Sequence, residues 1–484
     1  MLSGSYQLSL IKRLSLTGTL FLALTLLFFF SAFGFQNFTA DAHSYYASEI
    51  LCSDSIDRSY CSPSPQADIR LFRGSSDEPK QIQDYGAEYF SKPFAMLLNR
   101  LLDKDDTLRT ATVKIFFAKA GLSALLIIYS LGLTRRFPWL KHLAIHLAIC
   151  FFCLPYSLFA LAGYYPASIS SLGIFAGVLT LRAYFENPKV SRGDDVYLLT
   201  ALSLLTLLIT TTRFETSVMF SIMVFLVPIT IVSSQSLTLR RKRFASVVVV
   251  CLLAGGPALA LSPIARGTLS QFAAGTAKIL PRDVADRSVV VAKIGDVGFS
   301  VLAPVTLIDN SSRNIGEQFA NEAQEQLSTK TNSSLALTID YGIRFLAWTP
   351  LFIIFGIYGL TLWRNIRAKS QSSKGAAMVA LVFLFLFFFV PYVARTPWFF
   401  WYVLPLFICI LASHGYNQRF PRLRRVASGT VLLVNLASLV TTNYLLGDLI
   451  IANFVLSPLT QSLLAISLII VSLLGIHQLT QRVS

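Results

Sequence analysis

Apolar runs of about twenty residues recur along the whole chain, and this pattern limits the fold more than any other feature. Each run is long enough for a helix to cross the roughly 30 Å hydrocarbon core of a membrane. The composition agrees, because 54% of the 484 residues are hydrophobic and only 14% are charged. Soluble proteins carry about 25% charged residues. We therefore predict an all-α, polytopic membrane protein, which excludes a soluble enzyme, a disordered chain and a disulfide miniprotein.

Hydropathy predicts about twelve transmembrane helices in a single membrane domain that covers residues 1–484. The expected spans lie near residues 14–35, 111–133, 142–161, 167–185, 196–212, 214–234, 244–264, 345–363, 375–393, 397–416, 427–446 and 460–476. No internal repeat or low-complexity linker divides them. The first run is longer than the apolar region of a usual signal peptide, so we expect an uncleaved anchor.

Basic residues predict the orientation, because short cytoplasmic loops collect Lys and Arg. With both termini in the cytoplasm, the inside segments hold most of the basic residues, and their only acids are Glu186, Asp194 and Asp195. The short outside turns contain just Arg213 and Arg395 as basic residues. Topology therefore accounts for most of the formal net charge of +16, and no nucleic-acid partner is implied.

Two long extracytoplasmic loops follow from this topology, at residues 36–110 and 265–344. The first contains two amphipathic stretches, at 40–51 and 87–102, which are expected to form helices along the membrane surface. An inert connector is the alternative. Cys52 and Cys61 lie in the same loop, and we predict a disulfide between them in an oxidising compartment.

The familiar soluble-enzyme motifs are missing from the sequence. It contains no Walker loop, no HExxH, no GxSxG elbow and no GxGxxG after a strand. The chain therefore lacks the usual signatures of nucleotide hydrolysis and dinucleotide redox chemistry. Polar residues within the hydrocarbon, or at its edge, become the candidates, because such residues are costly there and are functional by default.

Asp41 is the candidate catalytic residue, since it follows the first span closely on the outside. A carboxylate there could remove a proton from an acceptor hydroxyl as a general base. It could instead cap the helix expected at 40–51. Asp41 and the nearby His43 could share a metal, but two ligands on a short loop are a weak signal. We assign no cofactor, and a divalent metal stays an unsupported alternative.

Two tight outside turns each contain one arginine. Arg213, beside Glu215, is expected to bind a phosphate, which its planar guanidinium fits. An ion pair that stabilises the hairpin is the alternative. Arg395 lies in an aromatic segment with Tyr402. Here lipid-phosphate binding competes with simple anchoring of the aromatic rings at the interface.

Two lysines lie in the second expected span. Lys114 can extend outward to water. Lys119 lies roughly 12 Å into the helix and needs a partner or a wet cavity. Glu88 and Lys92, late in the first loop, are expected to help shape the same pocket. A carboxylate and several cations on one side of the membrane suit a reaction in which a hydroxyl displaces a lipid-anchored phosphate.

The layout resembles the GT-C superfamily of integral-membrane glycosyltransferases. The resemblance is carried by Asp41 in segment 41–50, by Pro93 in segment 91–98, and by Arg395 followed by Tyr402 and Pro405. It implies that Asp41 is the catalytic base, that the donor is a polyprenyl-phosphate sugar, and that the acceptor is a glycan, a lipid or a protein.

The chain also departs from that superfamily. Many members have a second acid where this chain has Ala42, and some have a large C-terminal soluble domain that we do not expect here. We expect a multi-pass protein of a bacterial plasma membrane, with a eukaryotic secretory membrane as the alternative.

Our leading hypothesis is a glycosyltransferase that works on the extracytoplasmic face with an isoprenoid-phosphate donor. One alternative is a glycan polymerase or ligase of the O-antigen type, which would use the second long loop. Its candidate residues are Arg282, Arg287 and Arg313. A transporter or lipid flippase is the other alternative. The sequence Gly255-Gly256-Pro257 suits it, because transporters contain broken helices.

Overall fold

The computed structural model describes seven helices in full. They are α1 (Gly4–Phe33), α4 (Leu108–Arg136), α7 (Pro166–Glu186), α8 (Arg192–Thr212), α9 (Phe214–Thr230), α10 (Leu237–Leu261) and α19 (Pro458–Gln481). The described residues are 4–33, 97, 100–101, 108–137, 140, 166–186, 191–212, 214–230, 237–261, 367 and 458–481.

The prediction of an all-α fold is confirmed for this part of the chain, in which there is no strand. Other predictions lie outside the described residues. These are the spans at 142–161, 345–363, 375–393, 397–416 and 427–446, the loop at 265–344, and nearly all of the loop at 36–110.

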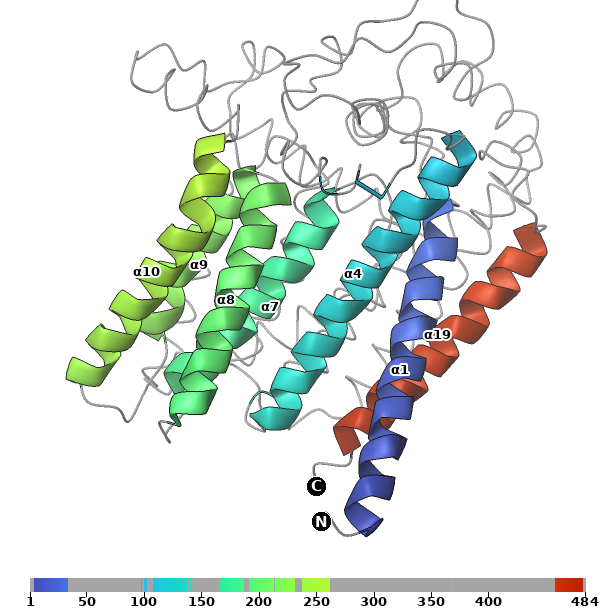
Figure 1. Ribbon diagram of the computed structural model, residues 1–484, viewed down its shortest axis with the longest axis horizontal. Helices are drawn as coiled ribbons and strands as arrows, with labels where there is room; N and C mark the ends of the chain where they lie inside the picture. The colour runs from blue at the N-terminus through green and yellow to red at the C-terminus, as the bar shows by residue number, and fades with distance from the viewer. Residues whose placement is uncertain are drawn as a thin grey trace, which may run out of the picture.

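The helices form two groups that share one interface (Figure 1). Helices α1, α4 and α19 pack together, α7 to α10 pack together, and α4 contacts α7 between the groups. Both chain termini lie at the same end of the bundle (Figure 1). We call this the basic end, because Arg136, Arg182 and Arg243 lie there. The opposite end, where α1 ends at Phe33 and α4 begins at Leu108, we call the loop end.

Charges at the start of α8 and at the end of α4 agree with the helix dipole. Helix α8 has Asp194 and Asp195 in its first turn, and α4 has Arg135 and Arg136 in its last. Among the described residues, Val113–Arg136 and Arg192–Thr212 are long and apolar enough to cross a membrane, judged by length and composition. Core helices of soluble proteins meet the same test, so the surface of the bundle is more informative.

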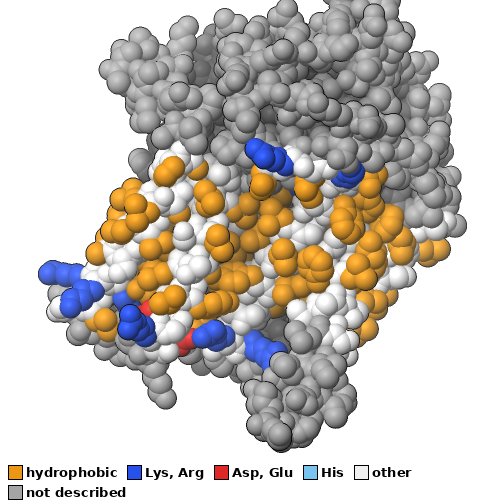
Figure 2. Space-filling model, viewed as in Figure 1, with side chains coloured by type: hydrophobic (Ala, Val, Ile, Leu, Met, Phe, Trp, Pro, Cys, Tyr) orange, Lys and Arg blue, Asp and Glu red, His pale blue; other side chains and the backbone are white. Residues whose placement is uncertain are grey.

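That surface is apolar over its middle and basic at its edges (Figure 2). Large hydrophobic side chains point outward from helices in both groups, and Leu204, Leu252 and Leu253 are 63%, 65% and 73% exposed. A soluble monomer rarely exposes a wide apolar patch. The exposed side chains therefore suit an apolar surrounding better than water.

The expectation that Gly255-Gly256-Pro257 breaks a helix is wrong. Helix α10 continues through all three residues to Leu261, and Pro257 lies inside it. Gly255 serves packing instead: a Cβ there would lie 3.0 Å from Cγ2 of Thr210 on α8. Small residues allow apolar helices to approach closely without bending.

Gly177 marks an even closer approach, between α7 and α9. A Cβ at this position would clash with the ring of Phe220, which is itself buried. Because Phe220 has little room to move, the clash would have to be relieved by separating the two helices. This glycine therefore determines the spacing of α7 and α9.

We expect Gly177→Ala to lower the stability of the full chain by about 1–3 kcal/mol, the usual cost of overpacking. The matched control is Gly132→Ala, because a Cβ at Gly132 would meet nothing within 4 Å. That change should be neutral or slightly stabilising, since Ala is the better helix former. Thermal unfolding in detergent measures both, and equal shifts for the two variants would contradict the close approach.

Candidate functional site

Few of the predicted site residues lie in the described part of the chain. It includes the side chains of Lys114 and Lys119, and only the backbone of Glu215, in the first turn of α9. The other predicted residues lie outside it: Asp41, His43, Cys52, Cys61, Glu88, Lys92, Arg213, Arg395 and Tyr402. Their convergence on one site stays a prediction.

Lys119 is buried completely, at 0% exposure, in the middle part of α4. It belongs to the inner stripe of that helix, with Ile115 one turn before it and Ser123 one turn after it, both also at 0%. Lys114 is only half-buried. The two lysines therefore differ in burial: Lys114 remains within reach of the surface, and Lys119 is enclosed by the bundle.

Helix α1 lies against this part of α4. The rings of Phe29 and Phe117 meet edge to face, with centroids 5.8 Å apart. A Cβ at Gly121 would lie 3.8 Å from Cζ of Phe21. Because α1 runs toward the loop end and α4 runs away from it (Figure 1), the end of α1 and the start of α4 lie at the same end of the bundle.

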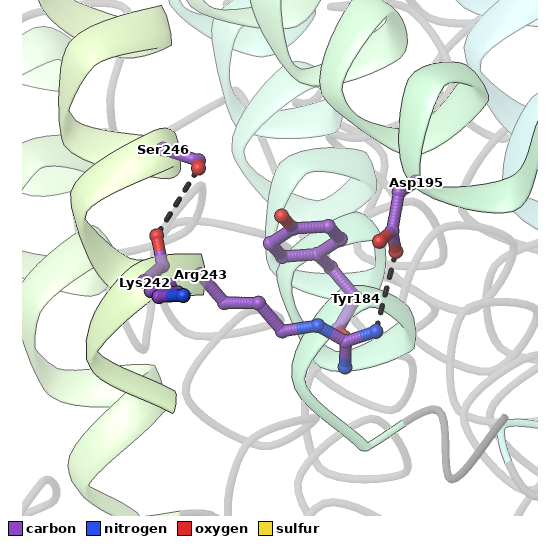
Figure 3. A network of polar contacts seen from close by, with 5 residues as sticks. All are labelled: Tyr184, Asp195, Lys242, Arg243 and Ser246. Atoms are coloured by element: carbon purple, nitrogen blue, oxygen red, sulfur yellow. Dashed lines mark hydrogen bonds and ion pairs between the residues drawn. The ribbon is translucent and has the colours of Figure 1, made fainter. Parts of the chain in front are cut away.

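At the basic end, a second polar cluster forms around Arg243 of α10 (Figure 3). This arginine is only 2% exposed. One guanidinium nitrogen, Nη1, donates to the backbone oxygen of Tyr184 at 2.6 Å, and Nη2 donates to Oδ1 of Asp195 at 3.2 Å. The guanidinium carbon also lies 4.9 Å from the centre of the Tyr184 ring, within cation–π range.

The contact with Tyr184 caps a helix end. Tyr184 is two residues from the end of α7, where the last carbonyl oxygens have no partner within the helix. Asp195 lies in the first turn of α8. Arg243 therefore connects the end of α7 and the start of α8 to α10, and fixes three helices by one side chain.

Two further ion pairs lie at the same end. Arg136 of α4 pairs with Asp194 of α8, and its guanidinium lies 4.7 Å from the centre of the Tyr197 ring. Arg182 pairs with Glu186 one turn later on α7, at 2.5 Å between Nη2 and Oε1. Each of the three acids in the predicted cytoplasmic segments is thus paired with an arginine.

Sequence reasoning missed this network, because it used these residues only as markers of orientation. A signal was present. The predicted cytoplasmic segments contain mostly Lys and Arg as charged residues, and the three acids are exceptions to this pattern. Such exceptions indicate that each acid has a specific partner nearby. The described contacts identify these partners, and they are structural, because each carboxylate is engaged by a neighbouring helix or turn.

The described residues contain no group of three or more His, Cys, Asp or Glu side chains that could hold a metal. Cys251 of α10 is a free thiol whose Sγ accepts a hydrogen bond from Thr206 at 3.5 Å. The predicted Cys52–Cys61 disulfide lies outside the described residues.

No model of a known protein family matches the chain, and no curated protein sequence matches it. The function is therefore inferred from the residues of this chain alone.

We expect Arg243→Gln to lower the stability of the full chain by about 3 kcal/mol, because removing one partner leaves Asp195 and the Tyr184 carbonyl without their donor. The matched control is Arg241→Gln, which removes the same charge from an exposed position two residues away. It should change stability by less than about 0.5 kcal/mol. Thermal unfolding in detergent without added lipid measures both. A similar loss for the two variants would show that Arg243 does not clamp the helices.

Proposed function

We propose that the chain is a multi-pass membrane protein with both termini in the cytoplasm. The exposed apolar side chains support this proposal, since a bilayer would cover them. The position of both termini at one end of the bundle supports it too (Figure 1). A chain that crosses the membrane an even number of times has both termini on the same side. The basic end would then face the cytoplasm, as short Lys- and Arg-rich connections do.

Within that membrane protein, we propose a glycosyltransferase that uses an isoprenoid-phosphate sugar on the extracytoplasmic face. The buried Lys119 is the observation that carries this proposal. A fully buried ammonium group in a helix that is apolar enough to cross a membrane is costly, and such residues mark functional sites by default. A lipid phosphate is a ligand that such a cation can bind inside a membrane protein.

Chain connectivity supports a base near the same place. Asp41 follows the end of α1 at Phe33 by eight residues. Eight residues reach at most about 28 Å, and Lys119 lies about 16 Å along α4 from its first residue. Because α1 ends and α4 begins at the loop end, the chain allows Asp41 to approach the α4 side of the bundle.

In the proposed reaction, Asp41 takes the proton of the acceptor hydroxyl. The hydroxyl oxygen then forms a bond to the anomeric carbon of the sugar, while the bond from that carbon to the phosphate oxygen breaks. The phosphate leaves with the electron pair, and Lys119, Arg213 and Arg395 stabilise its charge. The exposed apolar helix faces provide a surface for the isoprenoid tail.

We expect Asp41→Asn to lower sugar transfer at least about 100-fold, because a general base typically contributes a hundredfold or more. Membranes that contain the full chain would receive labelled polyprenyl-phosphate sugars, and the glycan products would be measured. Asp54→Asn is the matched control, since it makes the same change in the same loop and should leave transfer intact.

Three results would count against this assignment. Equal transfer by Asp41→Asn and the original chain would remove Asp41 from the reaction. Loss of activity on changing Arg282, Arg287 or Arg313, with Asp41 dispensable, would favour the polymerase or ligase. No transfer with any donor, together with movement of an unmodified lipid across the membrane, would favour a flippase.

We expect Lys119→Met to raise the KM for the lipid-linked donor by about ten- to a hundredfold, the range for losing a hydrogen bond to a charged group. Lys114→Met should have a smaller effect, because that side chain is only half-buried and water can replace its contacts. Lys119→Arg keeps the charge and should recover part of the lost affinity. An unchanged KM in a well-folded Lys119→Met protein would exclude this lysine from donor binding.

A further inference from the structure

Helix α10 has two opposite stripes with different chemistry. The inner stripe contains Arg243, Val247, Gly255 and Ala258, all buried, and it faces the rest of the bundle. The outer stripe is exposed and continues for five turns. In chain order it contains Thr238, Arg241, Lys242, Ala245, Val249, Leu252, Leu253 and Pro257. Spacings of three and four residues place all of these on one face.

The outer stripe is basic at one end and apolar along the rest. Arg241 and Lys242 are exposed at the basic end, and Val249, Leu252 and Leu253 are more than half exposed further along. Figure 2 shows Lys and Arg side chains along the lower edge of the bundle, with hydrophobic side chains above them. The stripe therefore offers cations and a hydrophobic strip in a fixed order.

The length of the stripe fits one leaflet of a membrane. Leu253 follows Lys242 by eleven positions, which corresponds to about 16 Å along a helix. This is close to half of the roughly 30 Å hydrocarbon core. A lipid whose headgroup contacts the cations would therefore lay its acyl chains along the apolar part of the same stripe.

The two exposed cations have no ion-pair partner among the described residues, whereas the next residue, Arg243, points inward and is paired. Both cations lie near the N-terminus of α10, where the helix dipole is positive and therefore repels them. Helix α10 has no acid in its first turn to offset this repulsion. A negative headgroup would offset both the mutual repulsion of the cations and their unfavourable position.

We propose that the outer stripe of α10 binds an anionic phospholipid, with Arg241 and Lys242 on the phosphate-containing headgroup and Val249, Leu252 and Leu253 on the acyl chains. This inference rests on the proposed membrane embedding and is independent of sugar transfer. Charge complementarity selects anionic lipids over zwitterionic ones, because juxtamembrane cations gain their binding energy from negative headgroups.

Native mass spectrometry of the full chain in detergent tests the site, with phosphatidylglycerol and phosphatidylcholine as probes. The original chain should bind phosphatidylglycerol more tightly. R241Q/K242Q should weaken that binding roughly 30-fold, which corresponds to about 1 kcal/mol for each cation. R241K/K242R keeps both charges and should keep the affinity. R364Q/R367Q removes two charges from another predicted cytoplasmic segment and should bind like the original chain.

Unchanged phosphatidylglycerol affinity in R241Q/K242Q would overturn the proposal, and so would equal affinity of the original chain for both lipids. Full competition by soluble glycerol phosphate would overturn the role of the apolar strip. The assay involves no sugar, so a chain that binds the anionic lipid but transfers no sugar would refute only the glycosyltransferase. A transferase without lipid preference would refute only this site.

Discussion

Burial of the Arg243 guanidinium is the contact on which the described packing of α7, α8 and α10 depends. Moving a cation out of water costs several kcal/mol and is compensated only when good partners replace the water. Arg243 obtains three: the carboxylate of Asp195, the backbone oxygen of Tyr184 and the face of its ring. These partners come from two helices, so the cost is met only when α7, α8 and α10 are all in place.

The first turn of α8 is the centre of this arrangement. Asp194 and Asp195 are consecutive, and each forms an ion pair with an arginine of a different helix. Asp194 pairs with Arg136 of α4, and Asp195 pairs with Arg243 of α10. At the loop end the described contacts between α7 and α8 are uncharged. Ser170 and Thr212 share a hydrogen bond between hydroxyl groups, and a Cβ at Gly173 would lie only 3.0 Å from Ile209. Directional charge fixes the register at one end, while close packing of small residues fixes the distances at the other.

The sequence predicts the helices well, because hydropathy is a local property. Each described helix overlaps an expected span, although α1 begins at Gly4 rather than near residue 14 and α10 begins at Leu237 rather than near residue 244. The basic segment at the start of α10 is itself helical. A hydropathy window finds only apolar residues and therefore cannot detect this part of the helix. The ion pairs between different helices were beyond prediction, since Arg243 and Asp195 are 48 residues apart and charge alone does not identify a partner. The role of Gly255 was misread for the same reason: its use depends on Thr206 and Thr210 of another helix. The predicted catalytic residues, Asp41 first among them, stay predictions.

Helix geometry gives consecutive cations separate roles. Successive residues are turned by about 100°, so Arg241 and Lys242 face outward while Arg243 faces Tyr184 and Asp195. The same short segment therefore provides the internal clamp and the charged part of the outer surface. From the sequence alone, all of these basic residues serve the same purpose, which is to predict which side of the membrane the segment faces. Their opposite directions show that a cluster of like charges at a helix end can be divided, with one member fixing the fold and its neighbours left available to the surroundings.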